Sequence, residues 1–143
     1  QFTAPQKPEI ITFRGMKGMK ELLMELLEAG GKEHHTFGST VKSLMLGEAW
    51  WVRYHQQRAQ KGIRAKLLFN ESLKSWQAEA KYPKAEVRYT SAGFEPLTET
   101  IIRNDKIGVL IWTEKPMGIL IHQKEPTASY DLFFQSIWSG SEN

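Results

Sequence analysis

The side chains in this sequence that could carry out chemistry are four histidines and a scatter of carboxylates, with no cysteine. His34 and His35 are adjacent, whereas His55 and His122 stand apart. Imidazole can act as a general base, a nucleophile or a metal ligand. Neighbouring residues on a strand point to opposite faces, so His34 and His35 cannot easily bind one metal ion. A composite site with the other two histidines remains open, but we expect no metal and no cofactor.

Two common hydrolytic designs find no support in the sequence. The absence of cysteine excludes thiolate nucleophiles, disulfides and cysteine-ligated zinc. Glu95, Asp105 and Glu114 do not form the close carboxylate pair that a glycosidase needs. The residues that remain are better suited to binding than to bond cleavage.

Four polar residues are candidates for holding a small ligand. Ser39 and Thr40 follow an expected strand, and α/β sheets collect ligands where strands end. Arg53 and Arg58 lie on an expected helix, and a guanidinium group can hold an anion through paired hydrogen bonds. The alternative for Ser39 and Thr40 is a simple turn, and the alternative for the arginines is a solvated helix surface.

Three aromatic residues, Trp50, Trp51 and Tyr54, fall close together on the same expected helix. They could stack against a sugar or a base. Aromatic pairs on an amphipathic helix belong more often to a core or to a subunit interface. We therefore expect these three residues to lie in the interface of a homodimer.

The elements that must position these residues alternate between strand and helix. Apolar residues at helical spacing predict helices, and short β-branched runs between turn residues predict strands. The expected strands are residues 9–13, 33–37, 63–69, 85–89, 97–103, 106–113 and 118–122. The expected helices are 19–29, 47–60, 71–81 and a last one that begins near 125. This order predicts an α/β domain with parallel crossovers, followed by an antiparallel meander in the same sheet and a C-terminal helix.

The 143 residues suit one domain with a real core, which we expect to span residues 9–143 after a lead-in at 1–8. No apolar run is long enough to cross a membrane, and no secretory signal is evident, so we expect a cytoplasmic protein. The net charge is +3, and the basic residues are spread out, which argues against direct nucleic-acid binding. The first residue is not Met, so we expect the segment to come from a longer chain.

Three segments carry a resemblance to a known family. Residues 7–18 contain a strand that ends in the turn Gly15-x-x-Gly18. Residues 58–66 form a helix-to-strand junction, and residues 118–138 form a last strand and a helix with Phe134 four residues before Trp138. Together they resemble the effector (C-terminal) domain of archaeal TrmB-type transcriptional regulators. The resemblance implies a phospholipase-D-like fold, and it implies DNA binding only through a winged helix located ahead of this segment.

The resemblance also implies a test for catalysis, because active phospholipase-D-like proteins carry His-x-Lys-x-x-x-x-Asp. Their histidine attacks phosphorus and their lysine neutralises the developing charge. Aligned on Asp105, this sequence has Thr98 at the histidine position and Thr100 at the lysine position. His122-Gln123-Lys124 also has the His-x-Lys spacing, but Ser129 stands where the aspartate is required. We therefore expect no catalytic residues, and two hydroxyls, Thr98 and Thr100, that could bind a polar ligand.

The sequence as a whole predicts a non-catalytic effector or sensor domain of a TrmB-like regulator. We expect it to form a homodimer, because related folds pair across the active-site face and a two-fold regulator matches palindromic operators. We expect a small polar molecule as its ligand. Two alternatives remain: a divergent phosphodiesterase or nuclease of the same fold, and a pure dimerisation module.

Overall fold

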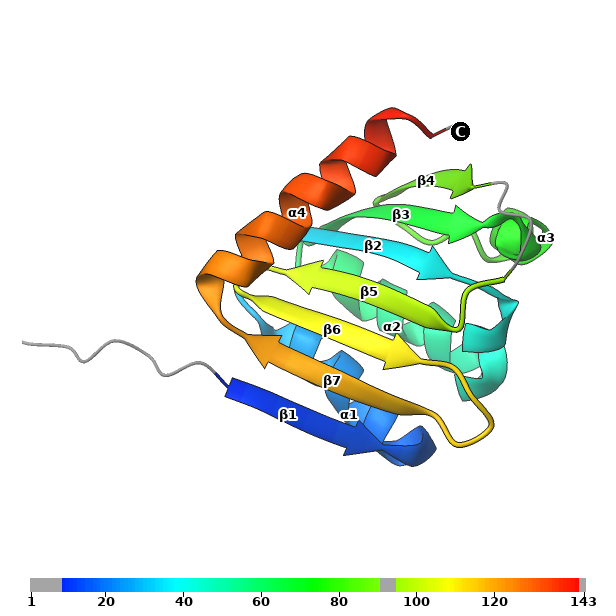
Figure 1. The fold of residues 1–143 in the computed structure, drawn as a ribbon. Helices are drawn as coiled ribbons and strands as arrows, with labels where there is room; N and C mark the ends of the chain where they lie inside the picture. The colour runs from blue at the N-terminus through cyan, green and yellow to red at the C-terminus, as the bar shows by residue number, and fades with distance from the viewer. Residues whose placement is uncertain (1–8, 91–94, 142–143) are drawn as a thin grey trace, which may run out of the picture.

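A mixed sheet of seven strands runs through the middle of the molecule, with helices against both faces (Figure 1). The computed structural model describes residues 9–90 and 95–141. The strands are β1 (Glu9–Arg14), β2 (Glu33–Ser39), β3 (Arg64–Asn70), β4 (Ala85–Thr90), β5 (Thr98–Arg103), β6 (Lys106–Ile111) and β7 (Met117–His122). The α-helices are α1 (Gly15–Glu28), α2 (Glu48–Gln60), α3 (Lys74–Ala80) and α4 (Lys124–Ser139), and two 3-10 helices are η1 (Val41–Leu46) and η2 (Glu71–Leu73).

The order of strands in the sheet follows from the connections between them. β2, β3 and β4 are parallel neighbours, because α2 and α3 carry the chain back before each next strand begins. β5, β6 and β7 are antiparallel neighbours joined by short connections. The β5–β6 turn holds Asn104 at a φ of 57°, a conformation that asparagine tolerates. The full order is β1-β7-β6-β5-β2-β3-β4, so the first strand pairs with the last.

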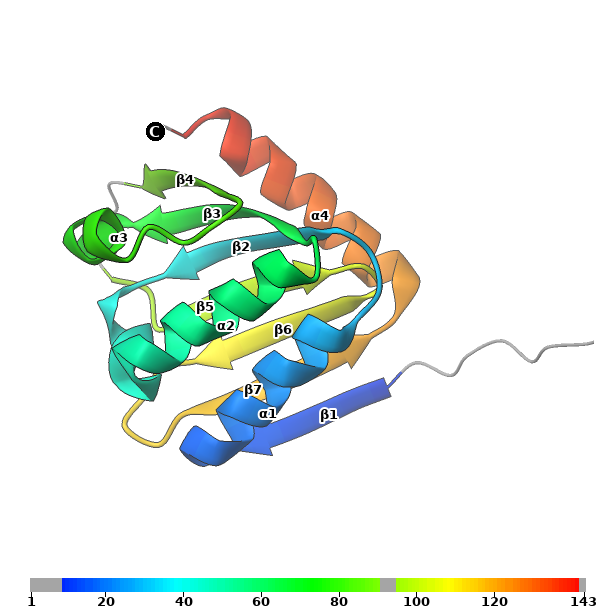
Figure 2. The same cartoon turned by 180° about the vertical axis from the view of Figure 1, so that it is seen from behind.

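Helices α1 and α2 cover one face of the sheet, and the larger part of the core lies beneath them (Figure 2). Leu22 and Leu26 are fully buried on the inner side of α1. Two glycines on the sheet allow this close packing. A Cβ atom at Gly108 would collide with Leu26, and one at Gly118 would collide with Leu22.

Helix α4 lies on the opposite face and crosses the sheet diagonally (Figure 1). It buries Phe134 and Trp138 against Leu68 and Ile102 in a second, smaller core. The part of this face beyond α4 carries no helix in the described structure. We call this area the open face; by strand register it includes Ile10, Thr12, Thr98, Thr100, Val109, Ile111, Met117 and Ile119.

The expected fold class and order of elements are confirmed, whereas some boundaries differ. α1 begins at Gly15 rather than near residue 19, because Gly15 at a φ of 73° turns the chain directly from β1 into the helix. The expected third helix starts as the 3-10 turn η2, which Asn70 caps by accepting a hydrogen bond from the Ser72 amide. The expected lead-in at 1–8 lies outside the described residues. Within residues 9–90 and 95–141, no helix has the length and apolar character needed to span a bilayer.

Candidate functional site

Thr98 and Thr100 lie on the open face of β5, at the positions where the resemblance places a catalytic histidine and lysine. Thr98 is exposed and Thr100 is buried. Ile111 lies opposite Thr98, and Thr100 lies between Val109 and Phe37 on the neighbouring strands. These apolar neighbours offer neither a base nor a cation. The two hydroxyls can form hydrogen bonds, but nothing directly opposite them would activate an attack on phosphorus.

His122 and Lys124 lie too far along the sheet to assist these threonines. The Nε2 atom of His122 is 2.7 Å from Oδ2 of Asp105, with which it forms a hydrogen bond. His122 lies level with Arg103, at the other end of β5 from Thr98. That distance is roughly 17 Å along the strand. Lys124 is exposed in the first turn of α4.

Ser39 and Thr40 are buried on the other side of the sheet. A bulge near the end of β2 shifts its register, so Ser39 pairs with the core residue Phe69. Thr40 caps η1, since its hydroxyl accepts a hydrogen bond from a backbone amide of that helix. The structure therefore does not bring Ser39 and Thr40 together with Thr98 and Thr100 in one site.

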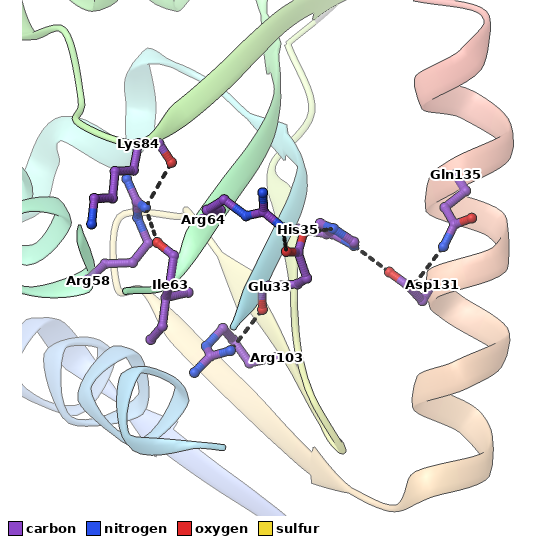
Figure 3. A network of polar contacts seen from close by, with 9 residues as sticks. All are labelled: Glu33, His35, Arg58, Ile63, Arg64, Lys84, Arg103, Asp131 and Gln135. Atoms are coloured by element: carbon purple, nitrogen blue, oxygen red, sulfur yellow. Dashed lines mark hydrogen bonds and ion pairs between the residues drawn. The ribbon is translucent and has the colours of Figure 1, made fainter. Parts of the chain in front are cut away.

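The two candidate arginines on α2 have different environments. Arg53 is exposed, whereas Arg58 is fully buried. The guanidinium of Arg58 donates hydrogen bonds to three carbonyl oxygens and one imidazole nitrogen, those of Ile63 (2.6 Å), Lys84 (3.2 Å), Pro83 (2.5 Å) and His55 (3.0 Å), partly drawn in Figure 3. Burial lowers the pKa of Arg58 to about 10, so it stays charged at neutral pH. Arg58 thus joins the end of α2 to the start of β3 and β4, and four of its five N–H groups are already used.

The aromatic residues expected at a dimer interface lie largely inside the molecule. Trp51 is 5% exposed and Tyr54 is 2% exposed. The Trp51 indole donates to the carbonyl of Ser43 at 2.7 Å, and the Tyr54 hydroxyl donates to the carbonyl of Leu23 at 3.0 Å. Only Trp50 is partly exposed, stacked on Tyr54. A side chain packed within its own chain offers little surface to a partner, so the interface expectation rests on Trp50 alone.

Sequence reasoning missed a buried carboxyl group, Glu99. It is 4% exposed and points into the larger core from the face of β5 opposite the threonines. Thr36 donates to one carboxyl oxygen at 3.3 Å, and the Trp112 indole donates to the other at 3.1 Å. Burial raises the pKa of Glu99 to about 7. The group can therefore gain or lose a proton near neutral pH.

Two histidines lie in the same interior region. His34 and His55 line a small cavity together with Glu99, and their rings meet edge to face with centroids 5.9 Å apart. Burial lowers the pKa of both histidines well below the usual value, so both are neutral at pH 7. Tyr82 stacks on His55 with a centroid distance of 3.9 Å, and Trp76 donates to the Tyr82 hydroxyl at 2.9 Å. The cavity thus has two neutral imidazoles and one carboxyl group of raised pKa in its wall.

One signal in the sequence could have identified Glu99. Thr98, Glu99 and Thr100 are consecutive on a strand, so Glu99 must point away from the threonines. Once the threonines are placed on the open side, the carboxyl has to enter the helix-covered core. The adjacent His34 and His35 were correctly expected on opposite faces, since His34 faces His55 and His35 faces α4.

A second polar network joins the sheet to α4 (Figure 3). Nδ1 of His35 is 2.6 Å from a carboxyl oxygen of Asp131, and the His35 ring stacks on Phe134. Glu33 lies 3.4 Å from the other imidazole nitrogen and also pairs with Arg64. All polar atoms of the ring are thus engaged, which makes this network an anchor for the helix. Among the described residues, no three histidine, aspartate or glutamate side chains are placed to hold a metal ion.

Comparison with known proteins finds similarity in structure and not in sequence. No family model and no curated protein sequence matches the chain. NucT from Helicobacter pylori superposes with a TM-score of 0.72 at 11% identity, covering 96% of this chain and 99% of NucT. Nuc from Salmonella typhimurium, a phospholipase D family member, superposes with a TM-score of 0.63 at 12% identity, covering 95% of this chain and 97% of Nuc.

TrmBL2, an archaeal chromatin protein described as binding DNA, superposes with a TM-score of 0.65 at 15% identity. The match covers 93% of this chain and 53% of the TrmBL2 chain, so the chain spans about half of TrmBL2. Stand-alone phospholipase-D-type proteins and part of a TrmB-type protein therefore share one architecture with this chain. The expected resemblance is confirmed at the level of the fold: the chain has the phospholipase-D-like fold, which NucT, Nuc and part of TrmBL2 share.

Proposed function

We propose that this chain is a non-catalytic effector and dimerisation domain of a TrmB-like transcriptional regulator, acting in the cytoplasm of an archaeon. One observation carries the proposal. The alignment on Asp105 sets Thr98 and Thr100 against the family's catalytic histidine and lysine, and in the structure the residues paired with them on the neighbouring strands are apolar. A hydroxyl without a base is a weak nucleophile, so the fold retains its architecture without the groups that cleave phosphodiesters.

The ligand that fits this position is small and polar. The exposed Thr98 hydroxyl, with Thr100 beside it on the same face, can donate and accept hydrogen bonds. The apolar side chains around them can exclude water from the bound molecule. Arg53 and the buried Arg58, Ser39 and Thr40 lie away from this face, so Thr98 and Thr100 carry the proposal.

The open face also suits a second copy of the chain. Its exposed apolar residues include Ile10, at 72% exposure, and it continues onto α4, where Phe133 is 54% exposed and contacts Phe37 with ring centroids 5.7 Å apart. Apolar surface of this kind gains free energy when another protein covers it. Pairing through this face would place the threonine positions of both copies near each other. Contact with DNA would come from a winged helix elsewhere in the longer regulator.

Two assays test this function. The chain is incubated with nucleic acid and with simple phosphodiesters, and we expect no turnover. Hydrolysis that His122→Ala abolishes would overturn the proposal in favour of a divergent phosphodiesterase or nuclease.

A thermal-shift screen of sugars, nucleotides and metabolites should yield a stabilising ligand, because binding to the native state alone raises stability. Thr98→Val should remove that shift. If no compound in the screen stabilises the chain, the ligand-binding role is contradicted and the alternative of a pure dimerisation module is supported.

A further inference from the structure

Thr36 lies on β2, and its buried hydroxyl has two acceptors within reach. Oγ1 of Thr36 is 2.8 Å from the carbonyl oxygen of Thr100 and 3.3 Å from Oε2 of Glu99, and all three residues are buried. A hydroxyl group carries a single hydrogen, and a carbonyl oxygen can only accept. Thr36 therefore cannot make a full hydrogen bond to both oxygens at once.

The protonation state of Glu99 decides which of the two bonds forms. The Trp112 indole donates to Oε1 of Glu99 at 3.1 Å, so a proton on the carboxyl group belongs on Oε2, the oxygen that contacts Thr36. A protonated Oε2 can donate to Thr36, which leaves the Thr36 hydrogen for the Thr100 carbonyl at the shorter distance. An ionised carboxylate can only accept, and it attracts a hydroxyl donor more strongly than a neutral carbonyl does. The Thr36 hydrogen is then drawn to Glu99.

Glu99 changes charge within a pH range close to neutral. Burial raises its pKa to about 7, and the Ser39, Trp112 and Thr36 donors act in the opposite direction. Ser39 is close enough to have this effect, yet its hydroxyl forms no hydrogen bond of normal geometry with the residues that the structure describes. The hydroxyl that contacts the carboxyl at a bonding distance is therefore that of Thr36.

The ionisable groups around Glu99 keep their charge in this range. They are His34 on β2, Tyr54, His55 and Arg58 on α2, Tyr82 ahead of β4, and Arg103 on β5. Burial lowers the pKa of the two histidines and raises the pKa of the two tyrosines, so all four are neutral at pH 7. Both arginines remain charged.

We propose that Glu99 and Thr36 form a proton switch at the pairing of β2 with β5. With a proton on Glu99, the Thr36 hydroxyl donates to the Thr100 carbonyl; when that proton is released to solvent, the hydroxyl turns to the carboxylate. This pairing joins the parallel strands of the sheet to the antiparallel ones, and Thr100 lies opposite Phe37 within it. The switch thus changes the hydrogen bonding between the two parts of the sheet, and it does not depend on a ligand at Thr98 and Thr100.

Carbon-13 NMR of the full chain tests the switch between about pH 5 and pH 9, a range that brackets the Glu99 pKa. The carboxyl carbon of Glu99 reports its ionisation, and the carbonyl carbon of Thr100 reports the hydrogen bond that it accepts. In the wild type we expect both signals to change with the same midpoint, the Thr100 signal moving upfield as its donor leaves. Thr36→Val should lose most of the Thr100 change while Glu99 still titrates, and Thr36→Ser, which retains a hydroxyl, should restore it.

Glu99→Gln gives a second test that keeps Thr36 in place. The glutamine amide imitates the protonated carboxyl, because it offers an acceptor to Trp112 and a donor to Thr36. The Thr100 carbonyl signal of this variant should stay at the low-pH position of the wild type at every pH. A Thr100 change as large in Thr36→Val or Glu99→Gln as in the wild type would overturn the proposal, and so would a Glu99 carboxyl carbon that does not titrate in this range.

Discussion

Arg58 and Arg103 are fully buried, and the hydrogen bonds of both go to carbonyl oxygens, apart from one that Arg58 donates to an imidazole nitrogen. Arg103 donates to the carbonyl oxygens of Leu26 (3.0 Å), Ala29 (2.6 Å) and Glu33 (2.8 Å). The first two lie at the C-terminal end of α1, where carbonyls lack helical partners and the helix dipole is negative. A guanidinium group supplies both hydrogen-bond donors for these carbonyls and a positive charge at the negative end of the helix dipole, because it carries its charge and several donors in one plane.

At the residue scale, we expect Arg103→Met to destabilise the domain strongly. The change removes the guanidinium donors from the carbonyls of Leu26, Ala29 and Glu33, although the Leu26 carbonyl keeps the Ala29 amide as a donor at 3.3 Å. At about 1–3 kcal/mol for each carbonyl left without a donor, the total loss is roughly 2 kcal/mol or more. Urea unfolding followed by fluorescence measures this loss. Arg53→Met, at an exposed arginine, is the control and should change stability by no more than about 0.5 kcal/mol. Similar values for the two variants would show that the Arg103 hydrogen bonds contribute little.

Glu99 gives a prediction about pH. Burial raises its pKa from 4.5 to about 7, so the folded state holds a proton that the unfolded state releases. Its contribution to stability is therefore complete below pH 4.5 and is lost as the pH rises towards 7. Gln at this position does not titrate and still accepts a hydrogen bond from Trp112.

We accordingly expect Glu99→Gln to become more stable relative to the wild type as the pH rises from 5 to 7.5. The full effect is on the order of 3 kcal/mol, from about 1.4 kcal/mol per pKa unit. Chemical denaturation at several pH values measures the difference in unfolding free energy between the variant and the wild type. The titration of the buried histidines contributes equally to both proteins and so cancels in this difference. A difference that stays flat across this range would mean that Glu99 is not the titrating group.

At the scale of elements, α4 is held to the sheet by a small number of contacts. Phe134 is fully buried, and the backbone carbonyl of Trp138 accepts a hydrogen bond from Arg88 at 2.8 Å. The Arg88 guanidinium also lies over the Trp138 ring, 4.4 Å from its centroid. His35 and Asp131 supply the polar contact nearer the start of the helix.

We expect Phe134→Ala to cost about 3–5 kcal/mol, as is usual when a buried aromatic side chain is removed. The loss should be accompanied by faster hydrogen exchange in α4 than in α1, because the second core depends on this ring. Ser136→Ala, at an exposed position of the same helix, serves as control and should leave both exchange rates and stability nearly unchanged. Uniform acceleration across all helices would indicate that α4 does not open separately.

The sequence is sufficient to predict the alternation of elements, because the periods of strands and helices depend on local spacing. It cannot specify that β1 pairs with β7, since that contact joins distant parts of the chain. The sequence also cannot distinguish a core position from an interface position for Trp51 and Tyr54, because cores and interfaces favour the same aromatic residues. These two residues were expected at a dimer interface and are buried within their own chain. Glu99 escapes notice for a related reason: a lone carboxyl on a strand looks solvent-exposed until the covering helix is known.

At the scale of the whole molecule, we expect two copies of the chain to form a dimer through the open face. We expect Phe133→Glu to convert a dimer into a monomer, because it places a charge in the apolar surface that a second copy would cover. Size-exclusion chromatography with light scattering gives the mass. Met24→Glu, on the exposed side of α1 at the other face of the sheet, is the control and should remain dimeric. A wild-type chain that is monomeric at all concentrations would exclude pairing through this face.

The pairing of β1 with β7 bears on how the chain reaches its native state during synthesis. β1 leaves the ribosome before β2 to β6, but its hydrogen-bonding partner β7 is made only after all of them. Until then, the apolar side of α1 has no β6 or β7 beneath it and remains exposed to water. We expect a nascent chain that stops before residue 117 to bind chaperones and to be cleaved rapidly by proteases. A chain that includes β7 and α4 should resist cleavage, because non-local pairing delays cooperative folding until both β1 and β7 are present.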